Sequence, residues 1–323
     1  MALYRRGAKG QEVSRIQARL RELGYYAGPI DGDFGGGTEA GVRAFQRVQG
    51  LEVDGTVGAK TWAALFRGGK IAEPAIVRRP LTYRCLALTG AFETGAPIPE
   101  CFAGLSGDFD GQGISFGALQ WNLGQGTLQR LLQDMDRTHP QILKGIFHQH
   151  YPVLRAMLAA QREEQLAWAR SIQDPRRSVL HEPWRGLFKT LGRRDECQGI
   201  QVKFAGRLYR AALALCKTYR VQSERAVALM FDIKVQNGSI SELVKAQIME
   251  DFTGIDRTGD RDAAEVARLR IIANRRAEAA HPRWVEDVRT RKLTIANGEG
   301  TVHGNSFNLE EQYGIRLKAV KAG

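Results

Sequence analysis

The sequence predicts a mainly α-helical protein with a small N-terminal unit and a larger second domain. Its 323 residues are about twice the length of a typical domain. Apolar residues recur at the three- and four-residue spacing of a helix face in both parts. Between the parts, a Gly68-Gly69 pair followed by Pro74 and Pro80 indicates a linker. We therefore expect a first domain over residues 1–67, a linker over 68–80 and a second domain over 81–323.

Composition and charge narrow the class of protein. With 43% hydrophobic and 25% charged residues, the chain resembles soluble globular proteins. No apolar stretch approaches the roughly 18 residues that cross a bilayer, so we expect no integral membrane segment. The net charge of +12 is spread out rather than gathered in one basic run. This pattern fits a general attraction to a polyanion better than sequence-specific nucleic-acid recognition. Nucleic acids, teichoic acids and peptidoglycan are all polyanions of this kind, and charge alone does not choose among them.

The cysteines and histidines predict no metal centre. The four cysteines form no Cys-x-x-Cys pair and are too sparse for a disulfide scaffold, so we expect buried, reduced thiols. His148 and His150 lack a nearby cysteine and do not have the i,i+4 spacing of a zinc pair on a helix. No metal or cofactor is therefore expected.

A repeat occupies the first seventy residues. The segments 30–35 and 53–58 share the pattern apolar-Asp-Gly-x-apolar-Gly, and each is followed by a threonine, with an offset of 23 residues. Asp-Gly pairs favour tight turns because Asp bonds nearby backbone and Gly accepts positive φ. Three apolar helix faces surround these turns: Val13, Ile16, Leu20 and Leu23; Val42, Phe45 and Val48; Trp62, Leu65 and Phe66. The repeat therefore predicts three short helices joined by two turns.

This unit resembles the peptidoglycan-binding type-1 domain over about residues 3–66. The resemblance rests on an ordered string: Gly10-Gln11-Glu12-Val13, Gln17, Leu20, Leu23-Gly24-Tyr25, both Asp-Gly turns, Phe45-Gln46 and Trp62-x-x-Leu65. It implies binding to the bacterial cell wall. We expect Phe45 and Trp62 to pack in the core rather than to stack on sugars. This stretch contains no His or Cys, so the zinc found in some relatives is not expected.

Two carboxylic acids in the second domain are candidates for catalysis. Glu93 ends the apolar run 86–92, and apolar surroundings favour a protonated carboxyl group, as a general acid requires. Asp110 follows seventeen residues later in a glycine-flanked turn, where a carboxylate stays ionised. Such a pair is what hydrolysis of a glycosidic bond needs. A salt bridge at Glu93 and a plain turn at Asp110 remain the alternatives, and a calcium loop lacks enough oxygen ligands.

The order of these residues resembles the active-site signature of the family-46 chitosanases and their lysozyme-like relatives. The matching residues are Glu93, then Asp110-Gly111-x-Gly113-x-Ser115-x-Gly117, and downstream Phe231-Asp232-Ile233-Lys234-Val235-Gln236-Asn237-Gly238. The resemblance implies a two-lobed α domain in which a small β and loop region carries the active site. It further implies Glu93 as general acid, Asp110 as base, Ser115 as the residue that orients water, and inversion at the anomeric carbon.

Further residues are expected to contact the substrate. Gln112 stands where chitosanases tend to carry Arg, and Asn237 where they tend to carry His, which argues against chitosan specificity. Asp232 matches an aspartate that joins an ionic network behind the acid. The residues expected at the substrate surface are Gln112, Gln120, Asn122, Asp232, Gln236 and Asn237. The choice between Asp108 and Asp110 as base stays open.

The two resemblances together imply a peptidoglycan hydrolase that cleaves a β-1,4 bond in the glycan strand, as an N-acetylmuramidase does. A chitosanase and a non-catalytic wall-binding protein are the alternatives. The first residues, Met-Ala-Leu-Tyr-Arg-Arg-Gly, lack the apolar core of a secretory signal. We therefore expect synthesis in the cytoplasm as a monomer. It would reach the wall through a holin, as a phage endolysin does, or through a delivery machine.

Overall fold

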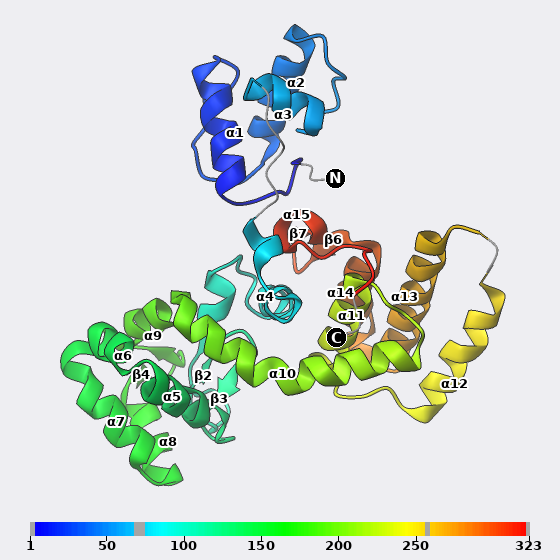
Figure 1. Ribbon diagram of the computed structural model, residues 1–323. Coiled ribbons are helices and arrows are strands. Elements are labelled where there is room, and N and C mark those ends of the chain that lie inside the picture. Colours follow the sequence, from blue (N-terminus) through cyan, green and yellow to red (C-terminus); the bar gives the residue numbers. More distant parts are fainter. Residues whose placement is uncertain (1–3, 68–74, 256–258, 321–323) are drawn as a thin grey trace. The chain divides into compact units, whose positions relative to one another are not determined.

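The computed structural model describes residues 4–67, 75–255 and 259–320. The chain is mainly helical, with three small antiparallel sheets (Figure 1). It divides into two compact units: Met1–Arg84 with Leu213–Ile233 and Asn237–Gly323, and Cys85–Ala212 with Lys234–Gln236. Of the expected linker, residues 68–74 lie outside the described residues, and Ala75–Arg78 forms a short 3-10 helix. The boundaries expected at 67 and 81 stay predictions.

Three short helices form the N-terminal module, as the repeat predicts: α1 (Gln11–Glu22), α2 (Gly36–Val48) and α3 (Ala59–Leu65). Phe45 and Trp62 are buried in its core, so their expected core role is confirmed. Two residues of the expected helix faces are exposed instead, Leu23 at 37% and Val48 at 65%. Leu23 follows the end of α1 and Val48 is the last residue of α2, so both lie beyond the turns that face the core.

A buried glutamine holds the first Asp-Gly turn. Gln17 Nε2 donates to Asp31 Oδ1 at 2.8 Å and to the carbonyl oxygen of Asp33 at 2.9 Å. The same nitrogen reaches Thr38 Oγ1 at 3.2 Å, while Gln17 Oε1 accepts from the amide of Gly32 at 2.9 Å. One side chain therefore satisfies polar groups of the turn and of the first helical turn of α2.

The second turn repeats this arrangement contact by contact. Gln46 Nε2 donates to Asp54 Oδ1 at 2.8 Å, to the carbonyl oxygen of Thr56 at 2.9 Å and to Thr61 Oγ1 at 3.1 Å. Gln46 Oε1 accepts from the amide of Gly55 at 2.9 Å. The sequence repeat is thus a repeat of a hydrogen-bonded clasp, in which a buried glutamine closes an Asp-Gly turn.

The second unit packs helices around one apolar core and carries two small sheets. Its α-helices and strands are α4 (Leu81–Thr94), β1 (Leu105–Ser106), β2 (Ser115–Phe116), β3 (Trp121–Asn122), α5 (Thr127–Thr138), α6 (Pro140–Phe147), α7 (Tyr151–Ala159), α8 (Arg162–Ser171), β4 (Gln173–Asp174), β5 (Val179–Leu180), α9 (Trp184–Arg193) and α10 (Asp195–Thr218). Two of these helices cross the unit boundary: α4 belongs to this unit from Cys85 onward, and α10 belongs to it as far as Ala212. The apolar face of α5 is fully buried in this core, as its spacing predicts. Trp121 packs partly buried against the same core.

All four cysteines are free and buried, as predicted from their spacing in the sequence. Burial raises the pKa of the Cys101, Cys197 and Cys216 thiols to about 12. Because the thiolate is the reactive form, these groups are inert at neutral pH.

The C-terminal part of the first unit surrounds one buried helix. Its elements are α11 (Glu224–Gln236), α12 (Glu242–Asp251), α13 (Arg261–Glu278), α14 (Val285–Asn297), the hairpin β6 (Glu299–Val302) and β7 (Asn305–Asn308), and α15 (Leu309–Tyr313) (Figure 1). Every residue of α11 from Ala226 to Ile233 is buried. Because a helix that is buried on all sides lies in a protein core, α11 is the central helix of this part of the first unit. Within the described residues no helix is both long and apolar enough to cross a membrane.

The buried face of α11 contains one charged residue, Asp232. Arg291 on α14 donates to it from Nη2 at 2.7 Å and from Nε at 3.1 Å, and the Lys292 ammonium also contacts the carboxylate. Burial alone would raise the pKa of Asp232, but attraction to the two cations and their hydrogen bonds outweigh it and hold this pKa well below its usual range. An ionic network around Asp232 is therefore present, and it joins α11 to α14.

Replacing Asp232 with Asn leaves two buried cations facing a neutral amide. We expect this change to destabilise the fold by about 3–5 kcal/mol, because uncompensated buried charge is costly. Asp251→Asn is the matched control: Asp251 also pairs with an arginine, Arg275, but both side chains of this pair are about one third exposed. The control should lose about 1 kcal/mol or less. Chemical denaturation of the full chain measures both, and equal losses would contradict the role given to burial.

Candidate active site

The end of α4 carries Glu93. Every residue from Tyr83 to Phe92 is buried, whereas Glu93 itself is exposed. The expectation that apolar groups enclose Glu93 is therefore wrong, because the helix leaves the core after Phe92. A Cβ on Gly90 would lie 2.8 Å from the Cβ of Ala118, so glycine permits α4 to pack tightly on the turn between β2 and β3. This contact holds the Glu93 turn against the small sheet.

Asp110 lies in the loop between β1 and β2 and is exposed. Its Oδ1 accepts the amide of Gln112 at 3.0 Å, which is a local turn of the kind that Asp-Gly favours. Gly111 and Gly113 have φ of 80° and 74°, in the left-handed region that favours glycine. Gln112 Oε1 accepts from Arg162 Nη2 at 3.3 Å, and Gln112 is half-buried. The loop thus presents the Asp110 carboxylate to solvent from a fixed backbone.

Asp108 differs from Asp110 because its backbone is pinned. Gln173 Oε1 accepts its amide at 2.7 Å, and Ser178 Oγ donates to its carbonyl oxygen at 3.1 Å. A Cβ on Gly107 would lie 2.0 Å from the carbonyl oxygen of Ser178, so glycine is required there. Among the described residues no hydrogen-bond donor reaches the buried Asp108 Oδ1. Sequence reasoning missed Gln173, since nothing local links it to a loop 65 residues away.

Ser115 lies on β2, opposite Asn122 of β3. Its hydroxyl accepts from Asn122 Nδ2 at 3.0 Å, and Asn122 Oδ1 accepts the amide of Gln125 at 3.1 Å, which fixes the amide orientation. A hydroxyl that accepts one hydrogen bond can still donate its own hydrogen. Asn122 is buried and positions Ser115, and its expected contact with substrate stays a prediction.

The turn between β2 and β3 is anchored by two glutamines. Gln120 has φ of 52°; its Oε1 accepts from Ser106 Oγ at 2.7 Å and its Nε2 donates to the carbonyl oxygen of Gly117 at 2.9 Å. The buried Gln201 of α10 accepts the amide of Ala118 at 2.9 Å. Gln120 is half-buried, so its role in substrate contact stays a prediction. Gln201 carries no sequence signal for this role because its partner is 83 residues away.

The downstream residues have different surroundings. Asp232 is completely buried and paired with Arg291 and Lys292, and its place among the substrate-binding residues stays a prediction. Gln236 and Asn237 lie at the end of α11 and are half-buried. The buried Asn237 Oδ1 has no hydrogen-bond partner in the described part of the chain. Substrate contacts of Gln236 and Asn237 stay predictions.

Curated proteins similar to this chain match about a fifth of its length. The spore cortex-lytic enzyme of Bacillus cereus is 47% identical over 68 residues, which cover 21% of this chain and 26% of that protein. The corresponding enzyme of Bacillus subtilis is 59% identical over 65 residues, covering 20% of this chain and 21% of that protein. The chain therefore spans about a quarter of the length of these curated relatives.

Several solved structures are similar over more of the chain. A family-46 chitosanase from Gynuella sunshinyii, in complex with chitotetraose, is aligned with 73% of this chain and 98% of its own, at 13% identity and a TM-score of 0.41. A similarity at this level carries no argument about the fold or the function. The module, by contrast, matches a family model over residues 9–65. That family is described as "Putative peptidoglycan binding domain".

Proposed function

We propose that this chain hydrolyses β-1,4 glycosidic bonds in the glycan strands of peptidoglycan, at the bond that an N-acetylmuramidase cleaves. The observation that carries the proposal is the combination of a peptidoglycan-binding module with two exposed carboxylates on adjacent elements of a second unit. Glu93 ends a helix that packs on the β2–β3 turn, and Asp110 lies in the loop that enters β2.

In this proposal Glu93 protonates the leaving oxygen and Asp110 activates a water molecule. Ser115, whose hydroxyl is oriented by Asn122, donates to that water or to the Asp110 carboxylate. A bound sugar chain would cover Glu93 and exclude water from it, and exclusion of water favours the neutral carboxyl group. With Asp110 as base the anomeric configuration inverts.

The module raises the local concentration of scissile bonds around the hydrolase without adding contacts to the active site. The net charge of +12 favours association with an anionic cell wall. We propose that the chain reaches the wall after release through a holin or delivery by a secretion machine, and that it works as a monomer without a cofactor.

The bond cleaved is identified by digesting purified peptidoglycan and analysing the borohydride-reduced products by mass spectrometry. We expect new reduced N-acetylmuramic acid ends, because a muramidase leaves that sugar at the reducing end. New N-acetylglucosamine ends would reverse the choice of bond. If peptidoglycan releases no sugar while chitosan does, the chitosanase alternative replaces this proposal.

Replacing Glu93 with Gln should reduce hydrolysis by about 10²-fold or more, since an amide cannot donate an acidic proton. Binding to wall sacculi should be unchanged. Glu100→Gln is the control: Glu100 lies in the same stretch of chain, is half-buried and pairs with Arg193, so its loss should leave turnover within about twofold. Hydrolysis that survives Glu93→Gln would show that another group is the acid.

The identity of the base is tested by Asp110→Asn and Asp108→Asn. We expect Asp110→Asn to lower kcat by about 10²-fold or more, because its exposed carboxylate is the one placed to accept a proton. Asp108→Asn should lower kcat by less than about tenfold, since the backbone contacts with Gln173 and Ser178 remain. The reverse order would assign the base to Asp108.

A further inference from the structure

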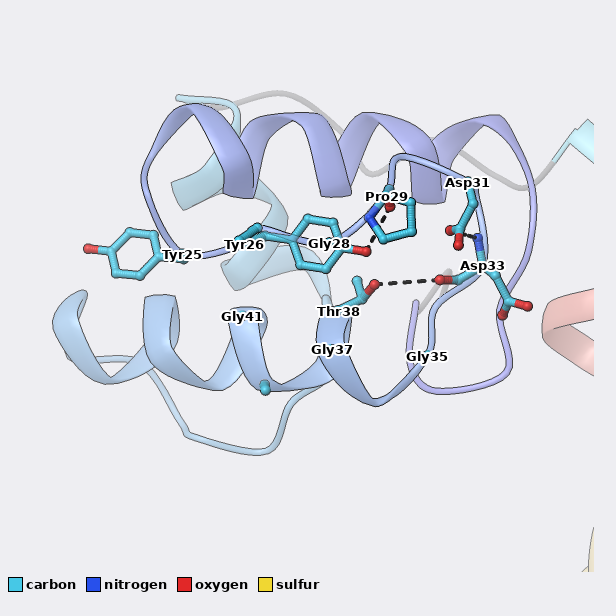
Figure 2. A pocket seen from close by; sticks show the side chains of 12 residues that line it. Tyr25, Tyr26, Gly28, Pro29, Asp31, Asp33, Gly35, Gly37, Thr38 and Gly41 are labelled. Atoms are coloured by element: carbon cyan, nitrogen blue, oxygen red, sulfur yellow. Dashed lines mark hydrogen bonds between the residues drawn. The ribbon is translucent and has the colours of Figure 1, made fainter.

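A groove lies on the N-terminal module, between the loop that follows α1 and the first turns of α2. Its volume is about 570 Å³, within the roughly 300–1,000 Å³ common for ligand sites. Figure 2 shows its wall, formed by Tyr25, Tyr26 and Pro29, and its floor on α2. All of its lining residues belong to this one module, within residues 25–41.

The wall of the groove is an addition to the repeated clasp. In the first repeat the turn aspartate, Asp31, follows the clasp glutamine, Gln17, by fourteen residues. In the second repeat Asp54 follows Gln46 by eight. The clasp contacts are the same in both repeats, so the longer loop is not needed to close the turn. The extra loop length instead places Tyr25–Pro29 beside α2 (Figure 2).

The floor is made of residues with little or no side chain. A Cβ on Gly41 would lie 2.7 Å from the carbonyl oxygen of Tyr25, so glycine permits the loop to approach the helix there. A Cβ on Gly37 would meet only the ring of Tyr26, at an ordinary 3.6 Å. Space at Gly37 is therefore open to a ligand, and a longer side chain at this position would occupy the groove.

Contacts within the module fix both tyrosine rings. The ring of Tyr25 packs edge-on against Phe45, with centroids 5.6 Å apart. The Tyr26 hydroxyl donates to the carbonyl oxygen of Pro29 at 2.7 Å, and a Cβ on Gly28 would lie 2.6 Å from that hydroxyl. Each ring is only partly buried, so some apolar ring surface remains accessible. Because the rings are already ordered, a ligand that binds to them causes little further loss of side-chain entropy.

The charged groups that line the groove are two carboxylates, those of Asp31 and Asp33. Asp31 is exposed, and hydrogen bonds from the Asp33 amide and from Gln17 hold the pKa of Asp31 below its usual value. Asp33 pairs with Lys9. Ionised carboxylates accept hydrogen bonds from hydroxyl and amide groups and repel other anions. The groove therefore suits a neutral ligand that offers O–H and N–H donors together with an apolar face.

We infer that this groove binds the glycan strand of peptidoglycan through a neutral N-acetylated hexosamine, not through the anionic stem peptide. The C–H face of the sugar would lie on a tyrosine ring, and its hydroxyl or acetamido N–H groups would donate to Asp31. This inference rests on the proposed function, in which the ligand of the module is peptidoglycan. It adds where on the module the polymer binds and which part of the polymer is recognised.

The test compares two glycine variants of the full chain, Gly37→Gln and Gly36→Gln. Gly37 lines the groove, whereas Gly36 is its helical neighbour, has open space at its Cβ and does not line the groove. We expect Gly37→Gln to bind purified sacculi about tenfold more weakly, or by about 1.4 kcal/mol, in co-sedimentation. Gly36→Gln should bind like the unchanged chain. Both variants leave the second unit intact, so any glycan bound there contributes equally.

Thermal unfolding checks that the two variants fold alike. If Gly37→Gln does not fold, Gly37→Ala replaces it, because its methyl group makes only ordinary contact with Tyr26; it should weaken binding about twofold. Equal binding of sacculi by the Gly37 and Gly36 variants would show that the groove is not the binding site, although the chain still binds the wall. Failure of the unchanged chain to bind sacculi would instead overturn the proposed function.

The ligand class is tested by competition on the unchanged chain and on Gly37→Gln. Tetra-N-acetylchitotetraose, a neutral oligosaccharide, should displace the unchanged chain from sacculi, and this displacement should be reduced in Gly37→Gln. The free stem tetrapeptide at the same concentration should have no effect. Displacement by the peptide alone would assign the groove to the stem peptide and overturn recognition of the glycan.

Discussion

A buried charge network is the constraint on which the C-terminal helical part depends. Asp232 lies on a helix that is enclosed on every side, where an ionised carboxylate is tolerated only when it is paired. Arg291 and Lys292 supply that pairing from neighbouring positions on α14, so α11 and α14 have one register in which the charges are satisfied. Apolar packing alone would permit several registers for a helix as uniformly buried as α11.

The same requirement, that buried polar groups find partners, is met by amide side chains elsewhere. In the N-terminal module Gln17 and Gln46 close the two Asp-Gly turns. In the second unit Gln173 and Gln201 hold the backbone on either side of the Asp110 loop and its sheet. An amide offers a donor and an acceptor together, so one side chain can serve both an N–H and a C=O group. Loops that carry the proposed functional groups are thereby held by buried amide side chains.

Glycines determine how closely these elements approach. Gly90 brings the end of α4, and with it Glu93, onto the β2–β3 turn, and Gly107 fits the Asp108 segment against Ser178. In the module, Gly41 lets the loop of Tyr25 and Tyr26 lie on α2, and at Gly37 no side chain fills the groove. The proposed catalytic carboxylates and the proposed sugar groove therefore both depend on places where a methyl group is missing.

The sequence by itself determined the helices of the module, the Asp-Gly turns and the buried face of α5, because these follow from local periodicity and turn chemistry. It also put Glu93 at a helix end and Asp110 in a loop. Only the tertiary structure decided that Glu93 is exposed, that Asn122 orients Ser115 and that Arg291 and Lys292 are the partners of Asp232. These outcomes depend on which residues meet in space. Arg291, for example, lies 59 residues after Asp232 along the chain, and no local sequence pattern encodes such a partner.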